Sequence, residues 1–261
     1  MRRHNFPAVV TWAVILFFYL PIVVLVAQSF NSSRFGGRWE ETSLKWYIRL
    51  MAERDIWRAL VNTLVIAASA TLASMVLGTS AAFALHRYAG SRLQKLHYSV
   101  IYMPLVLPEI LMGLSLLLFF VALHVELGLF TIGIAHVTFC LSYVTMTVLA
   151  RLQDFDYNVV EAAQDLGANW WQTLWRVLVP MLAPGILAGG LLAFTLSIDD
   201  FVISFFVAGS GSTTLPIKVY SMIKYGAPPL INALSTLLLL VTFTCVIVSQ
   251  WLSARSAAKS A

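Results

Sequence analysis

Long apolar runs separated by short polar segments dominate the pattern of the chain. Six runs are long enough to cross a bilayer as helices, since a hydrocarbon core about 30 Å thick needs roughly 20 helical residues. They cover residues 8–30, 59–85, 98–123, 129–150, 181–207 and 233–254. Helices satisfy their own backbone hydrogen bonds inside lipid. The pattern therefore predicts an all-α, polytopic membrane protein, with residues 1–261 forming a single domain of six transmembrane helices in contact with lipid.

Composition supports this class and excludes others. Apolar residues make up 59% of the chain and charged residues 11%, whereas a soluble domain is about 25% charged. Too little charge is present to coat a water-soluble enzyme. The net charge of +5 is explained by basic loops beside a membrane, so nucleic acid is not an expected partner. Cys140 and Cys245 lie inside apolar runs and form no metal or disulfide pattern.

Four prolines, Pro21, Pro104, Pro108 and Pro184, lie inside the predicted spans. Each removes a helical hydrogen bond and favours a kink. Membrane helices tolerate proline, so the kinks fit either a moving helix or a static one. The 17 lysine and arginine residues divide almost equally between the two sides of the membrane, so charge alone does not orient the spans.

The connection between spans four and five, residues 151–180, differs from the others in its length and polar content. Asn158 and Glu161 have the spacing of a capping box at a helix start. Gly167 suits the end of that helix. Asn169 can cap a second short helix, which the proline at the end of the segment would limit. A helix–turn–helix at the membrane edge would either rest on lipid through its tryptophans or form a docking surface for a partner.

The same segment resembles the EAA loop of ABC importer permeases. Glu161-Ala162-Ala163 is followed after three residues by Gly167, and after nine more by Val177-Leu178-Val179-Pro180. The family pattern is E-A-A-x3-G-x9-I-x-L-P, and two valines replace the usual Ile and Leu. The resemblance implies a type I ABC importer permease fold with a cytosolic coupling loop between helices 4 and 5. It assigns docking on an ATPase subunit to Glu161, Ala162, Ala163, Asp165, Gly167 and Pro180.

This family also supplies the orientation and the partners. It implies a bacterial inner membrane protein with both termini in the cytosol. The chain itself would not be an enzyme, because ATP and Mg²⁺ are expected in the partner ATPase. Consistent with this, no phosphate-binding G-x-x-x-x-G-K-[ST] motif, H-E-x-x-H motif or G-x-S-x-G motif occurs.

Within that family the chain is similar to permeases of putrescine/spermidine importers over nearly its whole length. The stretches that carry the likeness are residues 29–35, 45–47, 136–140, 194–200, 214–216, 220–222 and 232–234. The likeness implies a heterodimer with a sister permease, two ATPase subunits and a periplasmic polyamine-binding protein.

Three acids inside the spans give a separate argument for a cationic substrate. Glu109, Asp199 and Asp200 are present, whereas the predicted spans contain no lysine or arginine. A charge at the membrane centre costs about 2.5–3.5 kcal/mol on insertion scales, so such residues usually have a partner. A transported amine would supply the missing positive charge. A basic residue of a partner subunit, or protonation of the acid among hydroxyls, are the alternatives.

The helical rise places these acids at different depths. At 1.5 Å per residue, Glu109 is expected near mid-membrane and Asp199 near the outer mouth, which would form a stepped path for a linear polyamine. Trp46 and Tyr47 in the first outer loop are candidates for cation–π contact, or else for interfacial anchoring. His136 is expected to be a hydrogen-bonded packing residue rather than a proton sensor.

The sequence therefore predicts a membrane-spanning permease subunit of an ATP-driven putrescine/spermidine importer, which forms half of the pathway and has no catalytic or metal-binding residues. Both amines fit this reading. Two alternatives stay open. One is an ABC permease for another cationic substrate. The other is a stand-alone secondary carrier that exchanges cations through Glu109 and Asp199.

Overall fold

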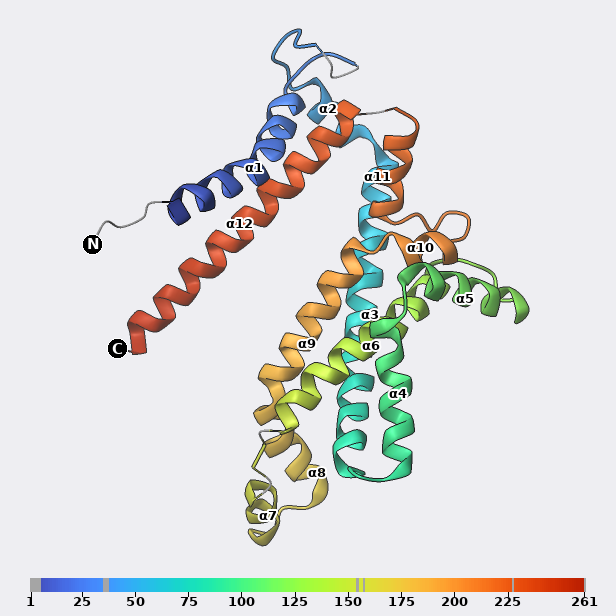
Figure 1. Cartoon of the computed structure of the whole chain (residues 1–261), viewed down its shortest axis with the longest axis vertical. Coiled ribbons are helices and arrows are strands. Elements are labelled where there is room, and N and C mark those ends of the chain that lie inside the picture. Colours follow the sequence, from blue (N-terminus) through green and yellow to red (C-terminus); the bar gives the residue numbers. More distant parts are fainter. Residues whose placement is uncertain (1–5, 35–37, 154, 157, 227, 261) are drawn as a thin grey trace. The chain divides into compact units, whose positions relative to one another are not determined.

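The computed structural model describes residues 6–34, 38–153, 155–156, 158–226 and 228–260, and these residues are mostly helical. The only pairing of extended backbone among them is an isolated bridge between Asn31 and Thr42. The helices in chain order are α1 (Phe6–Ser29), α2 (Lys45–Ala52), α3 (Arg54–Arg87), α4 (Arg92–Val106), α5 (Glu109–Ala122), α6 (Leu129–Gln153), α7 (Asn158–Asp165), α8 (Trp170–Thr173), η1 (Leu174–Leu178), α9 (Val179–Asp199), α10 (Val202–Val207), α11 (Leu215–Lys224) and α12 (Pro228–Ser260) (Figure 1). The all-α prediction is confirmed.

Among the described residues, five helical segments are long and apolar enough to cross a membrane. They are Pro7–Ser29, Arg54–Arg87, Leu129–Gln153, Trp170–Asp199 and Pro229–Ile247. A sixth crossing requires the bent pair α4 and α5 to count as one span. The predicted number of spans is thus reached only with a broken third span.

The third predicted span, residues 98–123, is broken, and the distortion expected from its prolines takes the form of a complete helix break. Helices α4 and α5 meet at an angle of 112°. Between them, Leu107 and Pro108 are extended, with ψ angles of 135° and 133°. The ring of a proline disfavours a helical conformation of the residue before it, and the proline has no N–H to donate. Pro108 therefore ends α4, whereas Pro21, Pro104 and Pro184 lie inside α1, α4 and α9.

The fifth span begins earlier than predicted and ends earlier too. The helix runs without interruption from Trp170 to Asp199 through one π-helical turn, Leu174–Leu178. In that turn the N–H of Val179 donates to the carbonyl of Leu174, which is an i→i−5 bond. Pro180 directly follows this turn, so the proline, which has no N–H, lies where the regular i→i−4 bonding is already interrupted. The expectation that Pro180 limits the second short helix is therefore wrong, because the helix continues through Pro180 to Asp199.

The chain divides into two compact units. The first unit comprises residues 1–57 and 219–261, and in it α12 packs against both α1 and α2. The second comprises residues 58–218, and in it α6 packs against α9.

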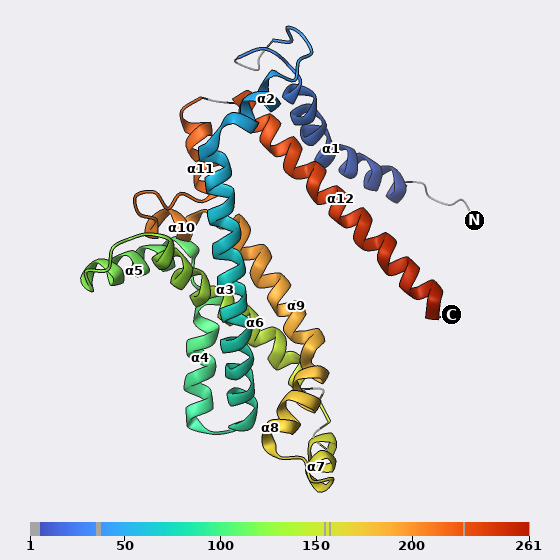
Figure 2. The same ribbon diagram turned by 180° about the vertical axis from the view of Figure 1, so that it is seen from behind.

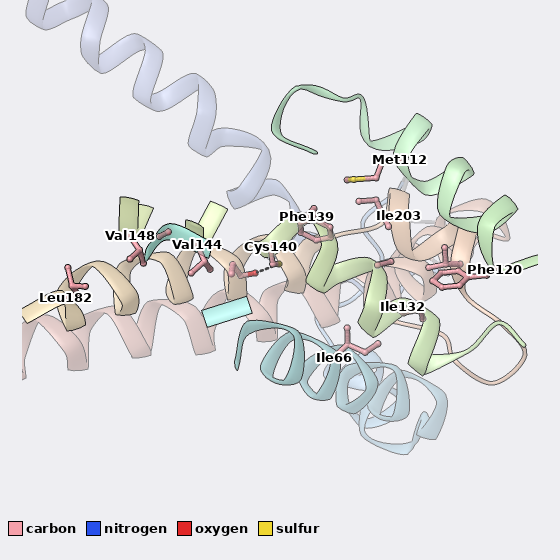
Figure 3. Packing of buried hydrophobic residues seen from close by; sticks show 14 of the residues in the cluster. Ile66, Met112, Phe120, Ile132, Phe139, Cys140, Val144, Val148, Leu182 and Ile203 are labelled. Atoms are coloured by element: carbon pink, nitrogen blue, oxygen red, sulfur yellow. Dashed lines mark hydrogen bonds between the residues drawn. The ribbon is translucent and has the colours of Figure 1, made fainter. Parts of the chain in front are cut away.

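Small residues allow α6 and α9 to approach closely. A side chain at Gly189 would meet the Cα of Val144 at 3.2 Å, and one at Gly185 would meet Arg151 Cβ at 3.1 Å. Such small-xxx-small spacing is typical of helix pairs in membranes. The core beside this contact is a cluster centred on α6, in which Ile132, Cys140 and Val144 are fully buried (Figure 3).

Within the second unit, two structural features lie at opposite ends of α6 and α9. Helices α5 and α10 lie at one end, and α7 and α8 lie at the other (Figure 1, Figure 2). The first end contains two helix breaks and the second a helical hairpin, and both contain residues that the sequence marks as functional.

Candidate functional site

A cavity of about 500 Å³ lies in the second unit where two broken helices meet. The breaks are the α4–α5 bend and the interruption at Asp200–Phe201 between α9 and α10. Side chains from α6 complete the wall. Residues that matter for its chemistry are Pro108, Glu109, Tyr143, Asp199, Asp200 and Phe201. The described lining thus contains three carboxylates and no lysine or arginine.

The two helix breaks bring Glu109 and Asp199 to the same cavity. Glu109 is the first residue of α5, and Asp199 is the last residue of α9. Both side chains are exposed, and within the described part of the chain neither makes an ion pair or a hydrogen bond. The prediction of two separate depths assumed straight helices, and the 112° bend removes its basis. Instead of two successive steps, the structure has one acidic chamber.

Asp200 differs from the other two acids because its carboxylate is occupied. Its side chain is only 6% exposed. Oδ1 accepts a hydrogen bond from the backbone N–H of Ile203 at 3.2 Å, and Oδ2 accepts from the N–H of Ser204 at 2.8 Å. Asp200 therefore caps the start of α10, where a negative charge is favourable. Oδ2 also lies 3.3 Å from Nε2 of His136.

His136 is the partner that the sequence argument did not find. Its ring is 1% exposed, with Nδ1 at 2.6 Å from Ser197 Oγ and Nε2 at 2.9 Å from Ser204 Oγ. The prediction of a hydrogen-bonded packing residue is confirmed. The sequence argument counted only lysine and arginine as partners for the three acids, and Asp200 instead has a histidine as its partner. The aspartate before a short apolar run was a local capping signal, whereas the pairing with a residue 64 positions earlier had no local signal.

Trp46 and Tyr47 belong to the other compact unit, and both have structural contacts there. Trp46 is 4% exposed, and its indole N–H donates to the carbonyl of Asn31 at 2.9 Å. Lys45 Nζ lies 5.0 Å from the centre of the Trp46 ring. The hydroxyls of Tyr47 and Ser29 share a hydrogen bond of 2.6 Å. Contact of Trp46 and Tyr47 with a substrate stays a prediction.

The helical hairpin of α7 and α8 contains the predicted docking residues. Glu161, Ala162 and Asp165 are exposed on α7, and Ala163 is half-buried. Gly167 ends this helix with φ at +89°, a conformation that glycine adopts without strain. Two bonds close the turn, from the N–H of Ala168 to the Ala163 carbonyl (3.0 Å) and from the N–H of Gly167 to the Gln164 carbonyl (2.8 Å). This is a Schellman motif, as the position of the glycine predicts.

The two predicted helix caps have different outcomes. Asn169 caps α8 in a capping box, in which its side chain accepts from the Gln172 N–H while the Gln172 side chain accepts from the Asn169 N–H. Asn158 is instead the first residue of α7, and its N–H donates to Oδ1 of Asp156 at 3.0 Å. A hollow of about 340 Å³ lies beside the turn. Trp170, Trp171 and Trp175 are exposed nearby in sequence, and Pro180 is exposed at the start of α9.

Comparison with known proteins identifies the class of this protein. Residues 74–259 match the family model described as binding-protein-dependent transport system inner membrane component. The chain belongs to this family, and it is a multi-pass membrane subunit of a transport system.

Relatives within the family are similar over nearly the whole chain. The chain is 41% identical to the spermidine/putrescine transport system permease protein PotC of Escherichia coli K12, over 91% of this chain and 90% of that one. It is also 41% identical to the putrescine transport system permease protein PotI of the same strain, over 97% and 95% of the two chains. Among solved structures, a chain of a bacterial ABC transporter for import of the acidic polysaccharide alginate superposes with a TM-score of 0.76. That match covers 96% of this chain and 98% of the other at 17% identity, so it concerns the fold alone. The type I ABC importer permease fold is thereby confirmed.

Proposed function

We propose that this chain is the permease subunit of an ATP-driven importer for putrescine or spermidine, and that substrate passes through the acidic cavity. The observation that carries the proposal is the placement of Glu109 and Asp199 on one cavity without a partner among the described residues. Uncompensated carboxylates at such a site favour a cationic ligand. The 41% identity to PotC and PotI supports the choice of a polyamine among cations.

The chemistry of the cavity fits a flexible chain with a positive charge at each end. Ammonium groups would be attracted to Glu109 and Asp199, because the low-dielectric surroundings strengthen interactions between opposite charges. The methylene groups between the charges would contact the aromatic rings of Phe139, Tyr143 and Phe201, which also line the cavity. The carbonyls that lose helical partners at the α4–α5 bend would add acceptors for the remaining N–H groups.

The same proposal assigns the hairpin to energy coupling. With both termini in the cytosol, α7 and α8 would dock on one ATPase subunit through Glu161, Ala162, Ala163, Asp165 and Gly167, with Pro180 at the base of the hairpin. A sister permease would complete the pathway, and a periplasmic binding protein would deliver the amine. ATP and Mg²⁺ would bind in a pair of ATPase subunits. Closure of that pair would move the hairpin, and the cavity would then become accessible from the outer side of the membrane instead of the inner side.

The test measures ATP hydrolysis by the reconstituted complex with its binding protein, with and without putrescine or spermidine. We expect stimulation in the wild type, and about a tenfold loss of stimulation in Asp199→Asn, because a bound ammonium would lose a charged partner. Glu126→Gln is the matched control, since this exposed acid lies in the α5–α6 connection and does not line the cavity. A complex that hydrolyses ATP but is stimulated only by another cation would replace the polyamine with that cation.

A further inference from the structure

One histidine connects both sides of the break between α9 and α10. His136 lies on α6, Ser197 is in the last turn of α9, and Ser204 is in the first turn of α10. The imidazole contacts both serine hydroxyls, at 2.6 and 2.9 Å, and the carboxylate of Asp200 at 3.3 Å. The side chains of His136, Ser197, Asp200 and Ser204 thus form a strut, a hydrogen-bonded network that links the end of α9 and the start of α10 to α6.

The hydrogen-bonding roles follow from the donors that are available. An ionised carboxylate only accepts hydrogen bonds, so beside an ionised Asp200 the ring of His136 carries an N–H on Nε2, which faces Asp200 and Ser204. In the neutral imidazole, Nδ1 then accepts a hydrogen bond from the hydroxyl of Ser197. All of these groups are nearly inaccessible, with Ser197 and Ser204 at 2% and 0% exposure. Buried polar groups without partners are costly, so the contacts of His136 with Ser197, Asp200 and Ser204 stabilise the break.

Asp199 is the residue whose position this arrangement determines. It lies between Ser197 and Asp200, both of which contact His136, and it is itself exposed on the cavity. The backbone turns extended at Asp200, with φ of −62° and ψ of 120°. Fixing the residues on either side of Asp199 therefore fixes the direction in which its carboxylate enters the cavity.

We propose that His136 is a positioning residue for transport: through Ser197, Asp200 and Ser204 it holds the α9–α10 break so that Asp199 faces the substrate. The proposal rests on the proposed function of the cavity. It also assigns different roles to Asp199 and Asp200. Asp200 belongs to the strut, so the carboxylates of the cavity that remain available to the substrate are Glu109 and Asp199. A side chain misplaced by about 1 Å is enough to lower a rate by roughly a hundredfold in enzymes, so such a strut has a large possible effect.

The test compares His136→Leu with His136→Gln in the reconstituted complex. Leucine has a similar size but makes no hydrogen bonds, whereas glutamine retains a donor and an acceptor. We expect His136→Leu to lower putrescine uptake per ATP hydrolysed about tenfold in assembled complexes, and His136→Gln to recover most of that loss. Ser142→Ala is the matched control, because Ser142 is also buried on α6 but its hydroxyl has no hydrogen-bond partner in the described structure.

A second measurement reports on Asp199 without depending on the substrate. Asp199→Cys is introduced together with Cys245→Ser, since Cys245 is exposed, whereas Cys140 is buried and donates to the Ala193 carbonyl. The rate of labelling by a charged thiol reagent is then measured with and without His136→Leu. We expect a change of about tenfold with His136→Leu and none with Ser142→Ala.

The outcomes separate the possible roles. Suppose that His136→Leu lowers the amount of assembled complex but changes neither the uptake per ATP hydrolysed nor the labelling rate of Asp199→Cys. His136 is then a packing residue only, and the proposal is overturned. Unchanged labelling alone overturns it too, as does unchanged coupling in a transporting complex. If the wild type transports no polyamine, the proposed function fails, and the labelling rate then decides whether His136 positions Asp199.

Discussion

The hairpin of α7 and α8 and the acidic cavity are built in opposite ways. The hairpin is held by bonds between near neighbours in the sequence, such as the Schellman turn at Gly167 and the capping box of Asn169 and Gln172. The cavity is held by bonds between distant residues, since His136 contacts Ser197 and Ser204, which lie 61 and 68 positions away. A surface that docks on a partner can thus be specified locally, whereas a cavity inside a bundle depends on several helices at once.

The largest effect is expected when the locally bonded hairpin is disrupted at its turn. Proline cannot adopt the positive φ of Gly167, so Gly167→Pro should displace α8 from α7 and abolish uptake, with the subunit still in the membrane. Gly90→Pro is the matched control, because Gly90 also has a positive φ of 83° and open space around it, but lies in the α3–α4 turn. Uptake and membrane content of both variants are measured. Normal uptake by Gly167→Pro would refute coupling through the hairpin.

The next prediction tests whether Glu109 and Asp199 bind the same amine at one site or act at two separate depths. Glu109→Gln and Asp199→Asn should each lower uptake about tenfold, by weakening attraction to the same bound amine. Because both acids line one cavity, the double variant should lose less than the product of the two single effects. Acids that act at independent depths would instead give additive free energies. Initial uptake rates of the four forms, at equal amounts of assembled complex, complete the cycle.

These differences explain how much the sequence revealed. The break after α4 follows from Pro108, and the end of α7 follows from Gly167, because both residues act on their own backbone. The continuous helix through Pro180 was not predicted. The π-helical turn at Leu174–Leu178 accommodates the proline, and no residue spacing in the sequence indicates such a turn. The pairing of Asp200 with His136 was missed for a different reason: it depends on how α6 packs on α9 and α10, and no spacing along the chain records that packing.

A smaller effect distinguishes two asparagines that look alike in the sequence. Asn169→Ala removes the capping box of α8 and should destabilise that helix start by about 1 kcal/mol. Asn158→Ala should have little effect, because Asn158 is inside α7 and Asp156 accepts its N–H. We expect a few-fold weaker coupling for the first variant alone, measured as ATPase stimulation by the loaded binding protein. Equal loss in both variants would mean that side-chain contacts with the partner, rather than capping, determine the effect.

The smallest expected effect concerns the unit that does not contain the cavity. Tyr47→Phe removes a hydroxyl that shares a 2.6 Å hydrogen bond with Ser29, and should reduce stability by about 1 kcal/mol. If Tyr47 has only this structural role, uptake should stay within about twofold of the wild type, since the aromatic ring is kept. Trp46→Phe extends the test, because it removes the indole N–H bond to Asn31 but keeps a ring beside Lys45. Thermal unfolding of the purified complex and uptake of putrescine are measured side by side. A large loss of uptake in either variant at unchanged unfolding temperature would assign Tyr47 or Trp46 to the substrate path, because an altered fold would lower both quantities together.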